Sequence, residues 1–256
     1  MTLRHSRLLA PVLWAVGCGS TTKMGEPSQP PPAQVAPPAR AEAQAEAPPA
    51  ATPSAAASPS APQAAPAAPK PFECTVVLGL KVTEEWFGAG FEQAVGDGHW
   101  QAVLRPHTFV EQWANPQDPV WSQAPLSPCE QRSGDPDRVV FFAADWNYKN
   151  ESEWITGLTA AVNAIRFKYR GARAIELLPM VRGPNNASCG DPKSVVQPFV
   201  DQAIDQIVAQ FSRLVRSGPK FEVSSCASFE KGGPHFTAEG RIEVAKLIAA
   251  RYSPSP

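Results

Sequence analysis

Aromatic residues are almost absent from the first 71 positions of this 256-residue chain, where Trp14 is the single one among 22 Phe, Trp and Tyr residues. The stretch from Pro27 to Pro71 holds 14 prolines and 17 alanines but only four charged residues. A segment of this composition cannot bury a hydrophobic core. We therefore expect residues 19–71 to form a disordered Pro/Ala-rich tether, residues 72–253 to form one domain, and residues 254–256 to form a short tail.

An excess of either charge is missing from the expected domain, which holds 18 Lys and Arg residues against 21 Asp and Glu residues from Phe72 onward. A nucleic-acid-binding surface needs a marked basic excess, so we expect no nucleic-acid partner. Metal-ligand spacing is missing as well, because no two cysteines stand in a C-x-x-C pattern and the four histidines form no cluster. We therefore expect no metal and no cofactor.

The sequence has no apolar run of the roughly 20 residues that a membrane-spanning helix needs. Residues 1–18 have the layout of a signal peptide, with basic residues before an apolar stretch from Leu8 to Val16. The stretch ends in Ala15-Val16-Gly17-Cys18, which resembles the lipobox of bacterial lipoproteins, whose cysteine is acylated. The resemblance implies a cell-envelope protein, periplasmic or at the cell surface, with a lipid anchor on Cys18. An ordinary cleaved signal with an incidental cysteine is the alternative.

From Cys74 onward, short apolar runs alternate with amphipathic stretches, which is the pattern of an α/β domain around a mostly parallel sheet. It predicts a flavodoxin-like three-layer sandwich with five strands in the order 2-1-3-4-5, where ligands bind beyond the carboxyl ends of the strands. The expected strands are Thr75–Leu78, Trp100–Leu104, Arg138–Ala144, Ala174–Val181 and Lys220–Ser224.

Apolar residues at helical spacing predict three long helices and one short one. The first follows a cap at Asn150, the second begins near Pro198, and the third runs from about Ala238 to Tyr252 with Thr237 as N-cap. The short helix carries Phe87, Phe91 and Val95, and the expected inward residues of the last helix are Ile242, Ala245, Ala249 and Tyr252.

Four cysteines remain in the domain, an even number that predicts two disulfides in an exported protein. Cys74 precedes the first strand and Cys129 precedes the third, so both lie at the amino edge of neighbouring strands. Cys189 follows the fourth strand and Cys226 the fifth, so both lie at the carboxyl edge. The strand order therefore predicts the pairs Cys74–Cys129 and Cys189–Cys226 among three possible connectivities.

His235 stands just before the cap of the last helix, on a loop at the carboxyl edge where an imidazole can act as a general base. A structural histidine is the alternative. The run His235-Phe236-Thr237-x-x-Gly240 resembles the last sequence block of the SGNH, or GDSL-type, hydrolases. The resemblance extends from about Cys74 to Tyr252 and implies hydrolysis of ester or acetyl groups on carbohydrate, lipid or envelope substrates.

The family opens with Gly-Asp-Ser-x-Thr/Ser after its first strand, and Gly79-Leu80-Lys81-Val82-Thr83 stands at that place. The resemblance therefore puts Lys81 at the position of the nucleophilic serine. Lys81 either loses its proton and acts as a nucleophile or stays charged and binds an anionic substrate group. Thr83 is another candidate nucleophile, although a helix cap is the interpretation that we favour for it.

The family's triad aspartate stands three residues before the histidine, where this chain has Gly232. Glu230 is the closest carboxylate in sequence and is the candidate to orient His235. The oxyanion-binding asparagine of the family is matched most nearly by Asn147 or Asp145. Without serine and aspartate, a working hydrolase with a rearranged site and a non-catalytic envelope- or polysaccharide-binding module both stay open.

Three residues are candidates for substrate binding: Arg182, Asp145 and Trp146. Arg182 follows the fourth strand, and anchoring of its loop is the alternative role. Trp146, together with Trp86, Trp113 and Trp121, either stacks on a saccharide or packs in the core. The expected partners are thus a membrane, through the lipid on Cys18, and a saccharide or acyl-ester substrate.

Overall fold

The computed structural model describes residues 70–96, 98–187, 189 and 199–253. The expected signal peptide with Cys18, residues 19–69 of the expected tether and the tail at 254–256 lie outside the described residues. Within the described part of the chain, no helix is both long enough and apolar enough to cross a membrane.

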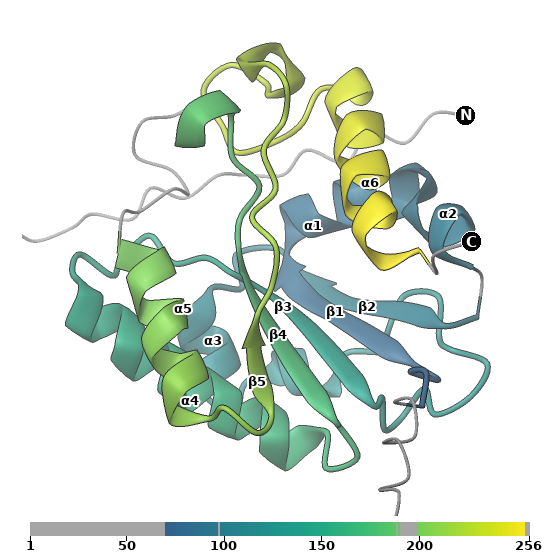
Figure 1. The fold of residues 1–256 in the computed structure, drawn as a ribbon, viewed down its shortest axis with the longest axis vertical. Coiled ribbons are helices and arrows are strands. Elements are labelled where there is room, and N and C mark those ends of the chain that lie inside the picture. Colours follow the sequence, from purple (N-terminus) through teal and green to yellow (C-terminus); the bar gives the residue numbers. More distant parts are fainter. Residues whose placement is uncertain (1–69, 97, 188, 190–198, 254–256) are drawn as a thin grey trace, which may run out of the picture. The chain divides into compact units, whose positions relative to one another are not determined.

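A five-stranded sheet with the order β2-β1-β3-β4-β5 forms the centre of the fold, and each neighbouring pair is parallel (Figure 1). The predicted fold class and strand order are confirmed. All six residues of β1 are buried, which follows from its central position and its apolar character on both faces. The strands are β1 Thr75–Leu80, β2 Trp100–Arg105, β3 Arg138–Ala143, β4 Ala174–Pro179 and β5 Val215–Ser217.

The prediction for the fifth strand was wrong, because β5 lies at Val215–Ser217 and not at Lys220–Ser224. Gly218-Pro219 separates the two segments, and proline has no backbone N–H for a strand ladder. Phe221 and Val223 are buried, which explains why their segment has a strand-like pattern. It continues beside the end of β4 through one isolated parallel bridge, from Arg182 to Glu222.

Helices cover both faces of the sheet and complete the three layers (Figure 1). Val76 and Leu78 of β1 pack against one helical layer, whereas Val77 packs against the other. The first layer contains α3 Val110–Ala114, α4 Glu151–Lys168 and α5 Phe199–Gln210. The second contains α1 Lys81–Trp86, the π-helical turn η1 Phe87–Phe91, α2 Glu92–Val95 and α6 Ala238–Tyr252, and the 3₁₀ turns are η2 Pro119–Ser122, η3 Pro184–Asn186 and η4 Cys226–Ser228.

Two helix caps predicted from the sequence are confirmed. Asn150 Oδ1 accepts from Glu153 N at 3.0 Å before α4, and Thr237 Oγ1 accepts from Gly240 N at 3.1 Å before α6. The predicted inward position of Ile242 was wrong, since this side chain is 48% exposed. The buried stripe of α6 instead runs through Gly240, Val244, Ala245, Ile248 and Ala249.

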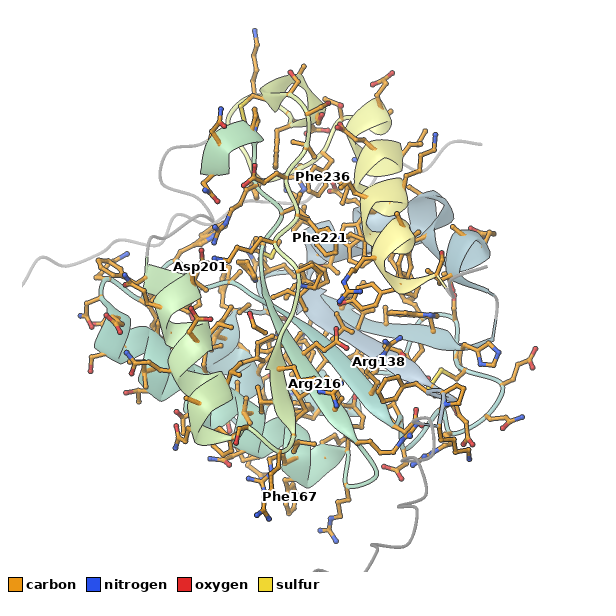
Figure 2. The ribbon with its side chains drawn as sticks, in the orientation of Figure 1. Arg138, Phe167, Asp201, Arg216, Phe221 and Phe236 are labelled. Atoms are coloured by element: carbon orange, nitrogen blue, oxygen red, sulfur yellow. A yellow bond between two sulfur atoms is a disulfide. The ribbon has the colours of Figure 1, made fainter. Side chains whose placement is uncertain are left out.

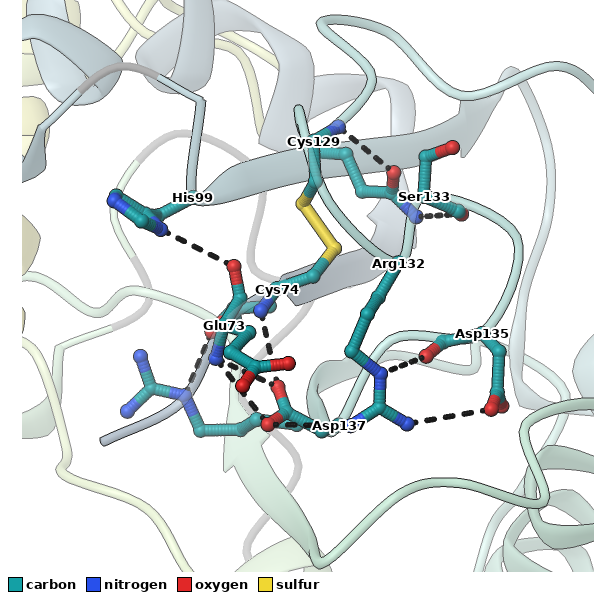
Figure 3. Close-up of a disulfide and its surroundings, with 11 residues drawn as sticks. Glu73, Cys74, His99, Cys129, Arg132, Ser133, Asp135 and Asp137 are labelled. Carbon is teal, nitrogen blue, oxygen red and sulfur yellow. Dashed lines mark hydrogen bonds and ion pairs between the residues drawn. A yellow bond between two sulfur atoms is a disulfide. The ribbon is translucent and has the colours of Figure 1, made fainter. Parts of the chain in front are cut away.

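Both predicted disulfides are present. Cys74–Cys129 joins the amino edge of the sheet to the segment before β3, and it lies beside Asp137 (Figure 3). Cys189–Cys226 joins the chain after β4 to η4 near the carboxyl edge. Two disulfides in one domain indicate an oxidising compartment outside the cytosol.

Candidate functional site

A pocket of about 150 Å³ lies at the carboxyl end of β1, where the strand passes directly into α1. Lys81 and His235 both line this pocket, although 153 residues lie between them in the sequence. Most of the lining is apolar or aromatic. The lining residues are Leu80, Lys81, Val82, Pro106, His107, Phe109, Trp146, Pro234 and His235.

The imidazole of His235 is held by Glu85, on α1. His235 Nδ1 lies 2.6 Å from Glu85 Oε1. A carboxylate only accepts hydrogen bonds, so Nδ1 carries the proton and Nε2 of the neutral ring is the proton acceptor. This carboxylate–histidine pair is the arrangement that prepares an imidazole for general-base chemistry.

Glu85 is itself held in place from more than one side. Its Oε2 accepts from Phe236 N at 2.9 Å and lies 3.5 Å from Arg241 Nε. The Glu85 side chain is 12% exposed, whereas that of His235 is 47% exposed. The loop before α6 is therefore fixed to α1 at a carboxylate with little exposure, and the imidazole is the more accessible partner.

Glu230, the predicted partner of His235, does not occupy this position. Its carboxylate is half-exposed and lies 3.9 Å from Arg241 Nη2. Its backbone N–H donates to His235 O at 2.8 Å, which closes the loop before α6. Glu85 therefore replaces Glu230 as the orienting carboxylate in the structure.

The sequence did not single out Glu85, because acidic side chains are common near the start of any helix, where the helix dipole favours them. The spacing between Lys81 and Glu85 is a sequence signal that points to Glu85. Glu85 stands four residues after Lys81, so it lies one turn into a helix that begins at the predicted ligand-binding edge.

Lys81, which the motif resemblance puts at the expected serine position, is the first residue of α1. Its side chain is 48% exposed and forms an ion pair with Glu84. Amines become nucleophilic when they are desolvated, and a half-exposed, ion-paired lysine lacks that environment. This geometry favours a charged ammonium at the pocket wall over a nucleophilic amine.

Thr83 does not cap α1, so the interpretation that we favoured for it was wrong. The N-cap of α1 is Leu80, and Thr83 is fully buried inside the helix. Its Oγ1 has no hydrogen-bond partner among the described residues. A Cβ built on Gly79 would lie 2.5 Å from this oxygen, so the hydroxyl packs closely against β1. This burial separates it from a substrate.

Of the residues after β3, the structure places Trp146 at the pocket. Trp146 is 39% exposed, and its ring centroid lies 4.9 Å from that of Phe109. The two rings form an aromatic wall beside Lys81 and His235. The other three tryptophans considered for saccharide stacking, Trp86, Trp113 and Trp121, are buried in the core.

Asp145 is buried and fastens the end of β3 to α3. Asp145 Oδ2 accepts from Glu111 N at 3.2 Å, and Oδ1 accepts from Asn147 N at 2.8 Å. Burial raises the pKa of Asp145, and the hydrogen bonds from Asn147 and Glu111 offset part of that increase. Asn147 is exposed, and neither residue belongs to the pocket lining.

Arg182 is buried and anchors the loop after β4. Its guanidinium makes a bidentate pair with Asp201 of α5, at 2.6 and 2.9 Å, and Nη1 also donates to Asn186 Oδ1 at 2.8 Å. Burial alone would raise the pKa of Asp201, but Arg182 and Lys220 together hold it below its ordinary value. The structure thus matches the anchoring alternative for Arg182 and places it outside the pocket lining.

No protein-family model and no curated protein matches the chain. Among solved structures, the chain is similar to a crystal structure described as that of a "putative acylhydrolase" from Bacteroides fragilis NCTC 9343. The TM-score is 0.42 with 14% sequence identity, over 70% of this chain and 85% of that chain. Because a likeness at this level transfers no activity, the functional argument depends on Glu85, His235 and Lys81.

Proposed function

We propose that this chain is an exported, lipid-anchored, SGNH-like hydrolase of short acyl esters in which water replaces the serine nucleophile. The single observation that carries this proposal is the Glu85–His235 hydrogen bond at the pocket shared with Lys81. In the sequence, two of the three triad positions are changed, with Lys81 in place of serine and Gly232 in place of aspartate. Glu85 supplies the carboxylate of the triad. The remaining difference from a serine hydrolase triad is the nucleophile.

In the proposed reaction, His235 Nε2 takes a proton from a water molecule as the water oxygen bonds to the acyl carbon. The tetrahedral intermediate then expels the alkoxide, which takes the proton from His235. The products are a carboxylic acid and an alcohol, so one ester and one water are consumed. Glu85 stabilises the imidazolium between the two proton transfers.

Lys81 supplies positive charge at the wall of the same pocket. Negative charge develops on the carbonyl oxygen in the transition state, and a nearby cation stabilises it. Lys81 therefore acts as an electrostatic group and not as the attacking group in this proposal.

The pocket limits the acyl group that fits. Ligand pockets for drug-sized molecules measure roughly 300–1,000 Å³, so a volume of about 150 Å³ suits a short acyl group such as acetyl. The wall of Trp146 and Phe109 suits the apolar face of a sugar ring. The lipobox-like Cys18 supports a cell-envelope location, which makes acetylated envelope saccharides the proposed substrates.

The test is hydrolysis of p-nitrophenyl acetate by the full chain with both disulfides formed. His235→Ala is expected to lower kcat by about 10²–10⁴, the usual contribution of a general base. His99→Ala is the matched control, since His99 is also exposed but lies at the amino edge, with Nδ1 3.1 Å from Glu73 O. Equal turnover in the parent and in His235→Ala contradicts the proposal.

A non-catalytic binding module is the second candidate, and Lys81 at the serine position is the observation that favours it. Such a module would retain the aromatic wall and the cation but turn over no ester. Binding of acetylated glycans by a parent chain without turnover, together with turnover gained in Lys81→Ser, would identify this second function.

A further inference from the structure

The amino edge of the sheet carries a concentration of positive charge that the proposed hydrolase does not use. Residues 166–173, at the end of α4 and before β4, contain four Lys and Arg residues and no Asp or Glu. Arg213 lies in the turn between α5 and β5. We call Arg166, Phe167, Lys168, Arg170 and Arg213 the basic edge. It contrasts with the slightly acidic composition of the whole domain.

The charge of the basic edge is not neutralised within the described part of the chain. None of its four cations has an ion pair with a described carboxylate, and all four are exposed. Two acids beside the turn are already engaged: Asp135 pairs with Arg132 at 3.3 Å, and Asp137 pairs with Arg173 at 2.7 Å. The edge is therefore free to bind an anionic surface.

Phe167 adds a protruding apolar group in the middle of these cations. It is 67% exposed, the highest value among the large hydrophobic residues that the structure describes, and Figure 2 shows it at the opposite end of the sheet from Phe236. The Arg170 guanidinium lies 5.3 Å from its ring centroid. Beside it, a hollow of about 530 Å³ is lined by Arg166, Arg170 and Leu214. Cations around an exposed aromatic ring form the pattern of an interfacial membrane contact.

The position of the first described residues favours a lipid bilayer as the partner of the basic edge. Arg173 donates to Lys70 O at 3.0 Å and to Pro71 O at 2.7 Å, so the first described residues lie at the amino edge. The preceding segment is the one that the sequence connects to the expected lipid on Cys18. The first described residues and the basic edge therefore both lie at the amino edge of the sheet.

We propose that the basic edge docks on an anionic phospholipid surface, with Phe167 among the headgroups and the arginines on lipid phosphates. Arginine binds phosphate oxygens through two parallel hydrogen bonds, which suits this role. The strands β1 to β4 are six residues long, so the pocket at the carboxyl edge lies about 20 Å from the docked edge. Docking in this orientation leaves the pocket open to substrates away from the membrane.

Co-sedimentation with phosphatidylglycerol vesicles and with phosphatidylcholine vesicles tests this proposal. The protein is the full chain with Cys18→Ser, so that no acyl chain contributes, and the rest of the N-terminal segment is the same in every variant. The parent is expected to bind phosphatidylglycerol more tightly than phosphatidylcholine, and the difference should shrink as salt is added. Arg166→Glu with Arg170→Glu is expected to weaken binding to phosphatidylglycerol by at least about 25-fold, since each cation near the surface contributes about fivefold.

The control is Lys231→Glu with Lys246→Glu, which changes the net charge equally at exposed positions on the loop before α6 and on α6. This control should bind like the parent, and Phe167→Ala, which removes no buried group, should bind several-fold more weakly. Equal losses in the two charge-reversed variants would overturn the proposal. So would equal binding of the parent to both lipids, or binding to soluble polygalacturonate with none to phosphatidylglycerol vesicles, which would identify a polysaccharide partner.

Discussion

At each edge of the sheet, a carboxylate with little exposure binds donors from distant segments, but the consequences differ. At the carboxyl edge, Glu85 accepts from Phe236 N and from His235. At the amino edge, Asp137 accepts from Cys74 N at 3.0 Å and from Arg173 Nη2 at 2.7 Å. Each carboxylate thus joins backbone N–H groups and side chains from distant segments, and Asp137 also accepts from Glu73 N at 3.1 Å. Each edge also has a disulfide.

The two edges differ in the surroundings of the side chain that the carboxylate binds, Arg173 at the amino edge and His235 at the carboxyl edge. The Arg173 side chain points back to the start of the domain, where it holds the carbonyls of Lys70 and Pro71. The His235 ring is half-exposed and lines a pocket. The same hydrogen-bonding arrangement therefore stabilises the chain at one edge and prepares a proton acceptor at the other.

Glu85→Gln has the largest expected effect and tests most directly whether the carboxyl edge, unlike the amino edge, has a catalytic role. Glutamine keeps the size of the side chain but removes the charge that stabilises the imidazolium and fixes the tautomer. Ester turnover is expected to fall by about 10³–10⁴-fold, as it does when the acid of a triad is neutralised. Steady-state kinetics on p-nitrophenyl acetate measure this loss.

Glu230→Gln is the matched control, because Glu230 lies on the same loop but pairs with Arg241. Its turnover should stay within a few-fold of the parent value. If Glu230→Gln loses as much activity as Glu85→Gln, the orienting role belongs to the loop and not to the hydrogen bond at His235 Nδ1.

The fold was largely predictable because its signals are local. Apolar runs separated by amphipathic stretches predicted the parallel order, and the order placed each cysteine at an edge. The error at Lys220–Ser224 had a local cause too: buried Phe221 and Val223 alternate as in a strand, while the short observed strand β5 offers only one buried residue, Val215.

The site was less predictable because its decisive contact is not local. His235 and Glu85 are 150 residues apart, and only the packing of α6 and its loop against α1 brings them together. The histidine itself was found from its place before a helix cap at the carboxyl edge. Its partner could not be chosen by closeness in sequence, which favoured Glu230.

Removal of the amino-edge disulfide tests whether that edge is purely structural. Replacing Cys74 and Cys129 by alanine opens a loop with a sequence separation of 55 residues. The chain-entropy model gives a stability loss of about 4 kcal/mol for a loop of this size. Urea denaturation measures the loss, and turnover of the folded fraction should stay unchanged. A drop in turnover of the folded protein would show that the two edges are coupled.

Asp137→Asn should lower stability by about 3 kcal/mol at neutral pH, because asparagine leaves the Arg173 pair broken and places an N–H group against backbone donors. Burial alone would raise the pKa of Asp137, but hydrogen bonds from Cys74, Arg173 and Glu73 hold it below its ordinary value. A lowered pKa contributes stability above about pH 4, which is lost as the pH falls through the folded value. The difference between parent and variant should therefore shrink on acidification, and urea melts at neutral and acid pH measure it. A constant difference contradicts this account of the amino edge.

Thr83→Val has the smallest expected effect and asks whether any hydroxyl in α1 contributes to the carboxyl-edge chemistry. Thr83 Oγ1 is buried without a hydrogen-bond partner among the described residues, so it loses its contact with water and gains nothing in return. Valine has nearly the same shape and no polar atom, so the variant is expected to be more stable by about 1 kcal/mol. Turnover should equal that of the parent, because the proposed nucleophile is water held at His235. A stable Thr83→Val protein without activity would instead make Thr83 the nucleophile and would require α1 to open during the reaction.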